Sequence, residues 1–311
     1  MRAWLPDPAA LARIRRCVVS VPTADSEQLV IAVEAFSINR GETFLLERPP
    51  VGWRPGKDVA GTVLAVGSAV PNVCVGQRVV AHPAQGGWAE QVAVGADRVA
   101  LLPDAVAFRT AAALPLAGLT ALRLTRVTGP LAARDVLLTG ASGGVGHVFV
   151  QLAAAHGANV TAVSAEPARG ERLLELGAAE VVTDVREADG PFDIALESTG
   201  GEALGIAWAR LRQHGRLVWF GQAGRKPAQM DFLDWRGATS GSLRRFDYAE
   251  DDTPVRTDLA TLVRLVASAR LHIEIGLLAD WAQTPDAIEA LLARRVRGNA
   301  VLTLDRNGDT P

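Results

Sequence analysis

The chain has 311 residues, a net charge of −2 and 49% hydrophobic residues. This is the composition of a globular protein of about two domains, and it gives no electrostatic reason to expect nucleic acid as a partner. No apolar run reaches the roughly 18 residues of a membrane helix, and the N-terminus lacks the apolar segment of a signal peptide, so we expect a cytoplasmic protein without membrane contact. Two cysteines, Cys17 and Cys74, exclude a disulfide framework and a zinc lobe held by four cysteines.

The first hundred residues predict a barrel-like β domain, because short apolar stretches recur between turns every ten or so residues. The expected strands are 1–5, 14–21, 29–39, 58–67, 75–81 and 88–94. We expect the third of these to break at Arg40–Gly41 and a proline-rich loop to follow.

From residue 109 onward, helical and strand-like stretches alternate. The expected helices are 110–126, 148–155, 164–176 and 203–213, and the expected strands are 136–138, 159–163, 181–182, 192–197 and 216–220. This alternation predicts a parallel sheet with helices on both faces. Two helices, 258–269 and 285–294, and a strand, 299–304, then return to the first domain. We therefore divide the chain into 1–107 with 252–311, and 108–251.

The most informative stretch runs from Asp135 to Arg169. After an apolar strand, Gly140, Gly143 and Gly146 have GxxGxxG spacing, and a helix and a second strand follow. Glycines at such a turn allow the backbone to approach a pyrophosphate, and the free N–H groups of the helix start favour negative charge. A glycine motif between a strand and a helix, with a second strand after it, predicts a dinucleotide site.

The end of the second strand indicates which dinucleotide binds. An NAD site usually has a carboxylate there, about 20 residues after the glycines, but this chain has Ser164. Ser164 can donate a hydrogen bond to a 2′-phosphate, and Arg169 can pair with it. NADPH is therefore the expected cofactor.

Motifs along nearly the whole chain resemble the medium-chain dehydrogenase/reductase superfamily, in its zinc-free, quinone-oxidoreductase (zeta-crystallin-like) branch. They are 35–39 (AFSIN), 55–61 (PGKDVAG), 75–79 (VGQRV), 112–120 (AALPLAGLT), 140–146 and 297–302. The resemblance implies an α/β protein, with a GroES-like β-barrel catalytic domain and a Rossmann doubly wound parallel sheet domain. It also implies a homodimer.

The same resemblance indicates which chemistry to expect. Where zinc alcohol dehydrogenases have a cysteine ligand and a His-Glu pair, this chain has Ile38–Asn39 and Lys57–Asp58, so it lacks zinc ligands. Without a Lewis acid, conjugate hydride addition to a quinone or an α,β-unsaturated carbonyl is easier than reduction of a simple ketone, which must stabilise an alkoxide. The predicted catalytic residues are Asn39 to orient substrate or nicotinamide ribose, Glu42 to brace it, and Lys57 to donate to a substrate oxygen.

The cofactor residues follow from the glycine loop and the resemblance together. Thr120 is expected near the nicotinamide, and 142–146 around the pyrophosphate. Three more follow the ends of later parallel strands, where ligands of such sheets bind. The full predicted set is Thr120, Gly140, Ser142, Gly143, Gly144, Val145, Gly146, Ser164, Arg169, Ser198, Phe220 and Gly221.

Two alternatives remain open: an enoyl-thioester reductase of a lipid or polyketide pathway, and an NADPH-binding protein with a structural or regulatory role. A short-chain dehydrogenase is excluded because that family needs Tyr-x-x-x-Lys, whereas the only tyrosine, Tyr248, has Asp252 four residues on.

Overall fold

The structure is a computed structural model, and it describes residues 1–231, 240–250 and 253–304. It divides into two compact units, Met1–Leu119 with Thr253–Pro311, and Thr120–Asp252. Residues 108–119, which the sequence division gave to the second domain, are grouped with the first unit; as domain boundaries, 107/108 and 251/252 stay a prediction. No helix of the described residues is long and apolar enough to cross a membrane.

The first unit is built on a seven-stranded sheet of order β14-β15-β3-β4-β5-β7, with β6 also paired to β3. Its strands are β3 Gln28–Ile38, β4 Val59–Val66, β5 Arg78–Ala81, β6 Gln91–Gly95, β7 Val99–Leu101, β14 Ile275–Asp280 and β15 Asn299–Thr303. β1 (Arg2–Pro6) and β2 (Ile14–Val18) form a separate antiparallel pair. The helices are α1 Arg40–Leu45, α2 Phe108–Ala112, the start of α3 Pro115–Thr128, α7 Val255–Ala267 and α8 Thr284–Leu292.

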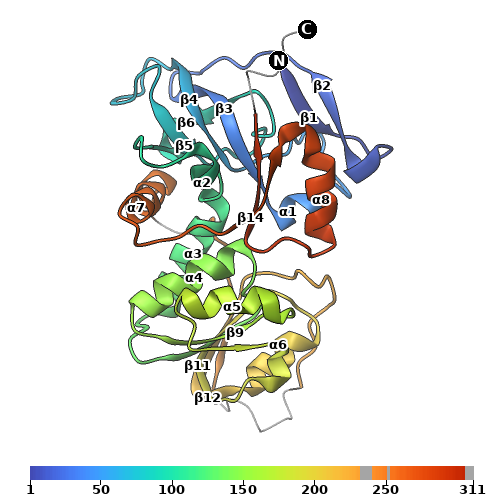
Figure 1. Cartoon of the computed structure of the whole chain (residues 1–311), viewed down its shortest axis with the longest axis vertical. Helices are drawn as coiled ribbons and strands as arrows, with labels where there is room; N and C mark the ends of the chain where they lie inside the picture. Colours follow the sequence, from blue (N-terminus) through green and yellow to red (C-terminus); the bar gives the residue numbers. More distant parts are fainter. Residues whose placement is uncertain (232–239, 251–252, 305–311) are drawn as a thin grey trace. The chain divides into compact units, whose positions relative to one another are not determined.

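The central strand of this sheet is β3, which pairs with β4, β6 and β15. Its run from Leu29 to Val33 is apolar, rich in β-branched residues and fully buried, as suits a strand covered on both faces. β15 lies antiparallel beside β3, so the last strand is part of the sheet of the first unit; in Figure 1 the red C-terminal elements accordingly lie among the blue strands.

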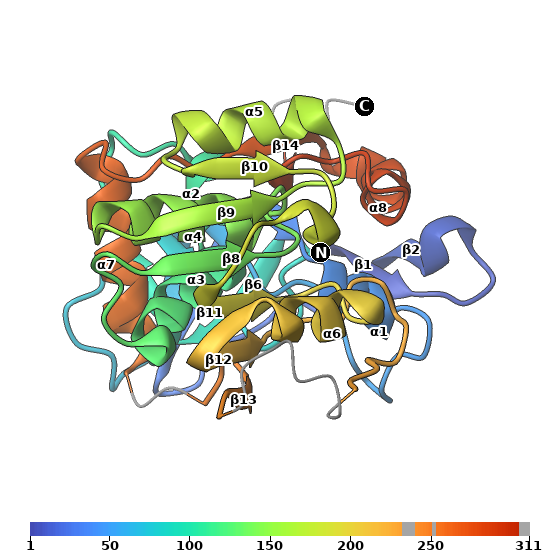
Figure 2. The same cartoon turned by 90° about the horizontal axis from the view of Figure 1, so that it is seen from below.

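The second unit contains a six-stranded parallel sheet of order β10-β9-β8-β11-β12-β13 (Figure 2). The strands are β8 Asp135–Leu138, β9 Asn159–Val163, β10 Glu180–Val182, β11 Phe192–Glu197, β12 Leu211–Trp219 and β13 Ser242–Arg245. The helices α4 Gly144–Ala155 and α5 Pro167–Glu175 pack on β9, with α5 also on β10, and α6 Glu202–Ala209 packs on β11 and β12. The strand order reverses at β8, which lies between β9 and β11.

Two expectations about the elements were wrong. The helix expected to run to residue 213 ends at Ala209, and β12 already begins at Leu211. The break expected at Arg40–Gly41 is the start of α1. By contrast, the strands expected at 159–163 and 192–197 have these bounds in the structure. Gly177 follows α5 with φ +106, the left-handed backbone conformation that often ends a helix.

Trp88 joins the core of the first unit to the strand that leads to Asn39. Its side chain is fully buried, its ring stacks on Phe36 with centroids 5.9 Å apart, and its indole N–H donates to the carbonyl oxygen of Ser37 at 3.0 Å. The tryptophan therefore holds the end of β3 by both packing and a hydrogen bond.

We expect Trp88→Phe to lower the free energy of unfolding by about 2–3 kcal/mol, because it leaves a cavity and removes a buried hydrogen bond. Val51→Ala is the control, since Val51 is fully exposed and its truncation should change stability by less than about 0.5 kcal/mol. Denaturant unfolding of both variants measures the difference. Equal stabilities would contradict this role of Trp88.

Candidate functional site

Asn39 directly follows β3 and is the N-cap residue of α1. The Glu42 carboxylate accepts a hydrogen bond from the backbone N–H of Asn39 at 3.0 Å, and the pair forms a capping box. The other carboxylate oxygen of Glu42 accepts from the N–H of Gly56 at 2.8 Å, which attaches the following loop to the same group. The Asn-x-x-Glu spacing therefore starts a helix where the sequence analysis expected only a break.

A second buried carboxylate, Asp58, lies beside Asn39. Its Oδ2 accepts from the Asn39 side-chain amide at 2.7 Å and from the Ser37 hydroxyl at 2.8 Å. Its Oδ1 accepts from the N–H of Leu116 at 3.0 Å and lies 3.1 Å from Nδ1 of His82, which donates in the tautomer protonated there. Asp58 and His82 are each 1% exposed. Four partners fill the roughly four lone-pair positions of a carboxylate.

The sequence analysis did not include Asp58 and His82 among the site residues. The only available signal was an aspartate next to Lys57 in a family motif, because hydrogen bonds between residues 24 positions apart leave no local pattern.

The pKa of the Glu42 carboxyl is strongly shifted. Burial, and secondarily the negative charge of Asp58, raise the pKa of the Glu42 carboxyl from its ordinary value of 4.5 to about 7. The N–H donors of Asn39 and Gly56 act in the opposite direction but do not offset the burial. Glu42 therefore titrates in the neutral range.

Asn39 and Glu42 thus lie together in one hydrogen-bonded cluster with Asp58. Lys57 directly precedes Asp58 in the chain and is half-buried. The catalytic roles of Asn39, Glu42 and Lys57 stay predictions.

In the second unit, the three glycines of the loop differ in how much space a side chain would have. Gly140 has φ +63, and a Cβ there would lie 2.6 Å from Oγ of Ser198; a Cβ on Gly146 would lie 2.2 Å from the carbonyl oxygen of Ala141. A Cβ on Gly143 would meet only the Gly140 carbonyl oxygen at 3.4 Å, an ordinary contact. The fold therefore requires Gly140 and Gly146 but leaves space at Gly143, as a loop that cradles a ligand would.

Gly140 and Ser198 meet at the ends of β8 and β11, where the strand order reverses. The backbone N–H of Ser198 donates to Oγ1 of Thr139 at 3.0 Å, and the Ser198 hydroxyl donates to the carbonyl oxygen of Thr139 at 3.1 Å. A Cβ on Gly221 would lie 3.1 Å from the Ser198 carbonyl oxygen, so the loop after β12 reaches the same edge. Ligands of open α/β sheets bind at this kind of switch point.

A buried carboxylate that the sequence analysis missed fixes this edge. Glu197, the last residue of β11, is fully buried and accepts from the N–H groups of Thr199 and Gly200, at 2.7 and 3.0 Å, and from the Thr139 hydroxyl at 3.1 Å. It holds the turn after β11 against the end of β8.

The two residues predicted to bind a 2′-phosphate already have partners in the chain. The buried Ser164 hydroxyl donates to the carbonyl oxygen of Glu166 at 3.1 Å, and Arg169 lies 3.3 Å from the Glu166 carboxylate. Because Glu166 is 62% exposed, this ion pair is of the weak surface kind that a phosphate can replace.

The other predicted cofactor residues occupy three places. Ser142, Gly144 and Val145 lie half-buried at the start of α4, Thr120 is 7% exposed in α3, and Phe220 follows β12.

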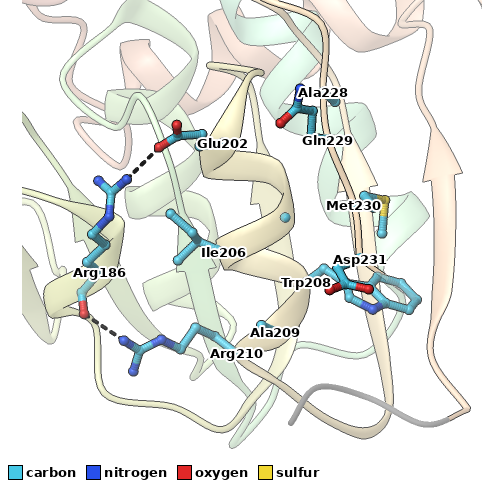
Figure 3. Close-up of a pocket in the computed structure, with 11 residues that line it drawn as sticks. Arg186, Glu202, Ile206, Trp208, Ala209, Arg210, Ala228, Gln229, Met230 and Asp231 are labelled. Carbon is cyan, nitrogen blue, oxygen red and sulfur yellow. Dashed lines mark hydrogen bonds and ion pairs between the residues drawn. The ribbon is translucent and has the colours of Figure 1, made fainter. Parts of the chain in front are cut away.

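A pocket of about 1150 Å³ in the second unit lies elsewhere. Figure 3 shows it between α6, with Ile206 and Trp208, and the segment 228–231, with Arg186 bound to Glu202 at its side. None of the predicted site residues lines it.

Comparison with known proteins decides the family. Residues 25–104 match the family model of the alcohol dehydrogenase GroES-like domain, and residues 144–267 match the zinc-binding dehydrogenase model. The chain is 32% identical over 225 residues to the quinone oxidoreductase of Mus musculus, covering 66% of this chain and 68% of that protein. The chain belongs to the medium-chain dehydrogenase/reductase superfamily, in its quinone oxidoreductase branch.

Two further similarities extend over most of this medium-chain reductase. A mycobacterial protein solved in complex with NADPH superimposes with a TM-score of 0.88 at 26% identity, covering 97% of this chain and all of that one. A polyketide synthase of Streptomyces halstedii is 32% identical over 286 residues, which is 89% of this chain but 5% of the synthase.

The residues of this reductase do not fit a zinc ion, although one matching family model is named for zinc. Asp58 and His82 are a buried pair, and hydrogen bonds already occupy both oxygens of Asp58. Within the described ranges, no group of three or more His, Cys, Asp or Glu side chains can hold a metal.

The raised pKa of Glu42 predicts that the stability of this reductase depends on pH. Because the folded state binds this proton more tightly than the unfolded state, the stabilisation is complete below about pH 4.5 and is lost as the pH rises to about 7. The loss amounts to about 3 kcal/mol. Denaturant unfolding of the wild type and of Glu42→Gln across this range measures it, since the variant cannot titrate at this position. A constant difference between the two proteins would contradict the shift.

Proposed function

We propose that this protein is an NADPH-dependent, zinc-independent reductase that transfers hydride to a quinone or an α,β-unsaturated carbonyl. The observation that carries the proposal is the hydrogen-bonded Asn39 at the place where zinc-dependent relatives have a cysteine ligand, in a chain of the quinone oxidoreductase branch. Hydride addition to a conjugated acceptor needs less stabilisation of negative charge than reduction of a simple ketone.

The glycine loop supports NADPH as the cofactor. The backbone N–H groups at the start of α4, from Ser142 to Gly146, would hold the pyrophosphate, and Arg169 would leave Glu166 to pair with the 2′-phosphate. When bound, NADPH supplies the hydride. Asn39 would orient the substrate or the nicotinamide ribose, Glu42 would brace Asn39, and Lys57 would donate a hydrogen bond to a substrate oxygen.

A homodimer and a cytoplasmic location belong to the same proposal. The dimer is supported by β13, the last strand of the parallel sheet, whose four residues are all exposed at its edge. The partners would be small conjugated carbonyl compounds.

A second candidate is an enoyl-thioester reductase. It is supported by the match to a segment of a polyketide synthase that corresponds to most of this chain.

The proposal predicts that Gly146→Ala lowers the stability of the protein, whereas Gly143→Ala weakens its binding of NADPH. Alanine at Gly146 collides with backbone, so the variant should unfold at a lower temperature. Alanine at Gly143 has space, so its melting temperature should stay within about 2 °C of the wild type, while its methyl group obstructs the pyrophosphate and weakens NADPH binding at least about tenfold. Fluorescence titration with NADPH measures the affinity. Normal binding by a stable Gly143→Ala protein would place the pyrophosphate elsewhere.

The acceptor is tested by NADPH oxidation in the presence of a chelator, against quinones, simple enones and enoyl thioesters. We expect turnover with quinones or enones, undiminished by the chelator. Activity confined to thioesters would support the second candidate. Tight NADPH binding without turnover of any acceptor would overturn the reductase proposal and favour a structural or regulatory role.

A further inference from the structure

The cluster under Asn39 contains more than the proposed catalytic residues require. Two buried carboxylates, Glu42 and Asp58, lie on either side of the Asn39 amide nitrogen, at 3.4 and 2.7 Å. Burial of two such groups is unfavourable unless each is fully hydrogen-bonded or its charge is balanced. The hydrogen bonds that stabilise these two carboxylates therefore determine how Asn39 is held.

Asp58 has the complete set of partners. All four of its neighbours can donate, from Ser37, Asn39, His82 and the backbone of Leu116, so the site suits a carboxylate that accepts on every side. Glu42 differs, because its acceptor positions face two backbone N–H groups and the more distant Asn39 amide. Asp58 is thus the stronger of the two anchors of the Asn39 side chain.

We propose that Asp58 is the positioning residue of the Asn39 amide, and that His82 holds Asp58 in place through its Nδ1–H. The proposal rests on the proposed function only for its predicted effect on kcat. Asp58 turns the amide nitrogen of Asn39 toward the interior, and His82 closes the network from the end of β5. Neither residue needs to touch substrate or cofactor.

The charged groups around Glu42 make the cluster observable by titration. Asp58 faces it from the start of β4, with His82 behind Asp58 after β5. Arg40, on the same helix, instead donates to the carbonyl oxygen of Leu291 in α8, on the side of Arg294. The Asn39 amide, between the two carboxylates, should therefore report the titration of Glu42.

The side-chain NH₂ signals of Asn39 test this directly. In protein labelled with ¹⁵N-asparagine and assigned with Asn39→Ser, we expect the Asn39 signals to shift with a midpoint near pH 7. Asp58→Asn should move the Asn39 signals and lower the midpoint, because the charge that opposes ionisation of Glu42 is gone. It should also reduce kcat with the preferred acceptor about ten- to a hundredfold, since a displaced catalytic group is poorly aligned. Unchanged signals and midpoint would overturn the proposal.

Variants of His82 keep the test valid if Asp58→Asn does not fold. Asparagine can place its amide nitrogen near the position of Nδ1, whereas leucine offers no donor. We expect His82→Leu to move the Asn39 signals and to lower kcat, and His82→Asn to restore both toward the wild type. Equal spectra for wild type, His82→Leu and His82→Asn would show that His82 does not position Asp58. Because the spectra need no turnover, they decide the proposal even if no acceptor is reduced.

Discussion

The hydrogen bonds to Asp58 are the interaction on which the first unit's site depends. They join the end of β3 through Ser37 and Asn39, the end of β5 through His82, and the start of α3 through Leu116. These segments are far apart in the sequence, and a single buried carboxylate can connect them because it accepts from several directions. The same geometry gives both oxygens of Asp58 hydrogen-bond donors from within the first unit.

The second unit uses a buried carboxylate in the same way. Glu197 accepts from backbone and hydroxyl donors at the reversal of the strand order, and so fixes the turn beside Gly140. Each carboxylate satisfies donors that would otherwise be unpaired and costly in the interior. In each unit, one buried carboxylate therefore connects the ends of separate strands.

Local patterns allowed much of the fold to be predicted. Strands 159–163 and 192–197 are short apolar runs between turn residues, and the GxxGxxG motif specifies strand, turn and helix together. The prediction of a helix up to residue 213 was wrong because Leu211 continues an apolar pattern that suits a helix or a strand. Pairing with β11 makes this segment a strand. Asp58 and His82 could not be identified as anchors, since their role lies in long-range hydrogen bonds. Glu197 likewise joins its own turn to β8 only through Thr139, 58 positions away. The weak pair of Arg169 with Glu166 depends on side-chain placement and was equally hidden.

The central claim is that hydride passes from NADPH held by this chain to a conjugated acceptor. The most direct measurement is the single-turnover rate with NADPH carrying deuterium at one or the other of the two hydrogens on nicotinamide C4, with a chelator present. The account predicts a slower reaction with only one of the two labelled cofactors, because a fixed site presents one face of the nicotinamide ring. Equal rates with both labelled cofactors and with unlabelled NADPH would contradict hydride transfer as the rate-limiting chemistry of a positioned site.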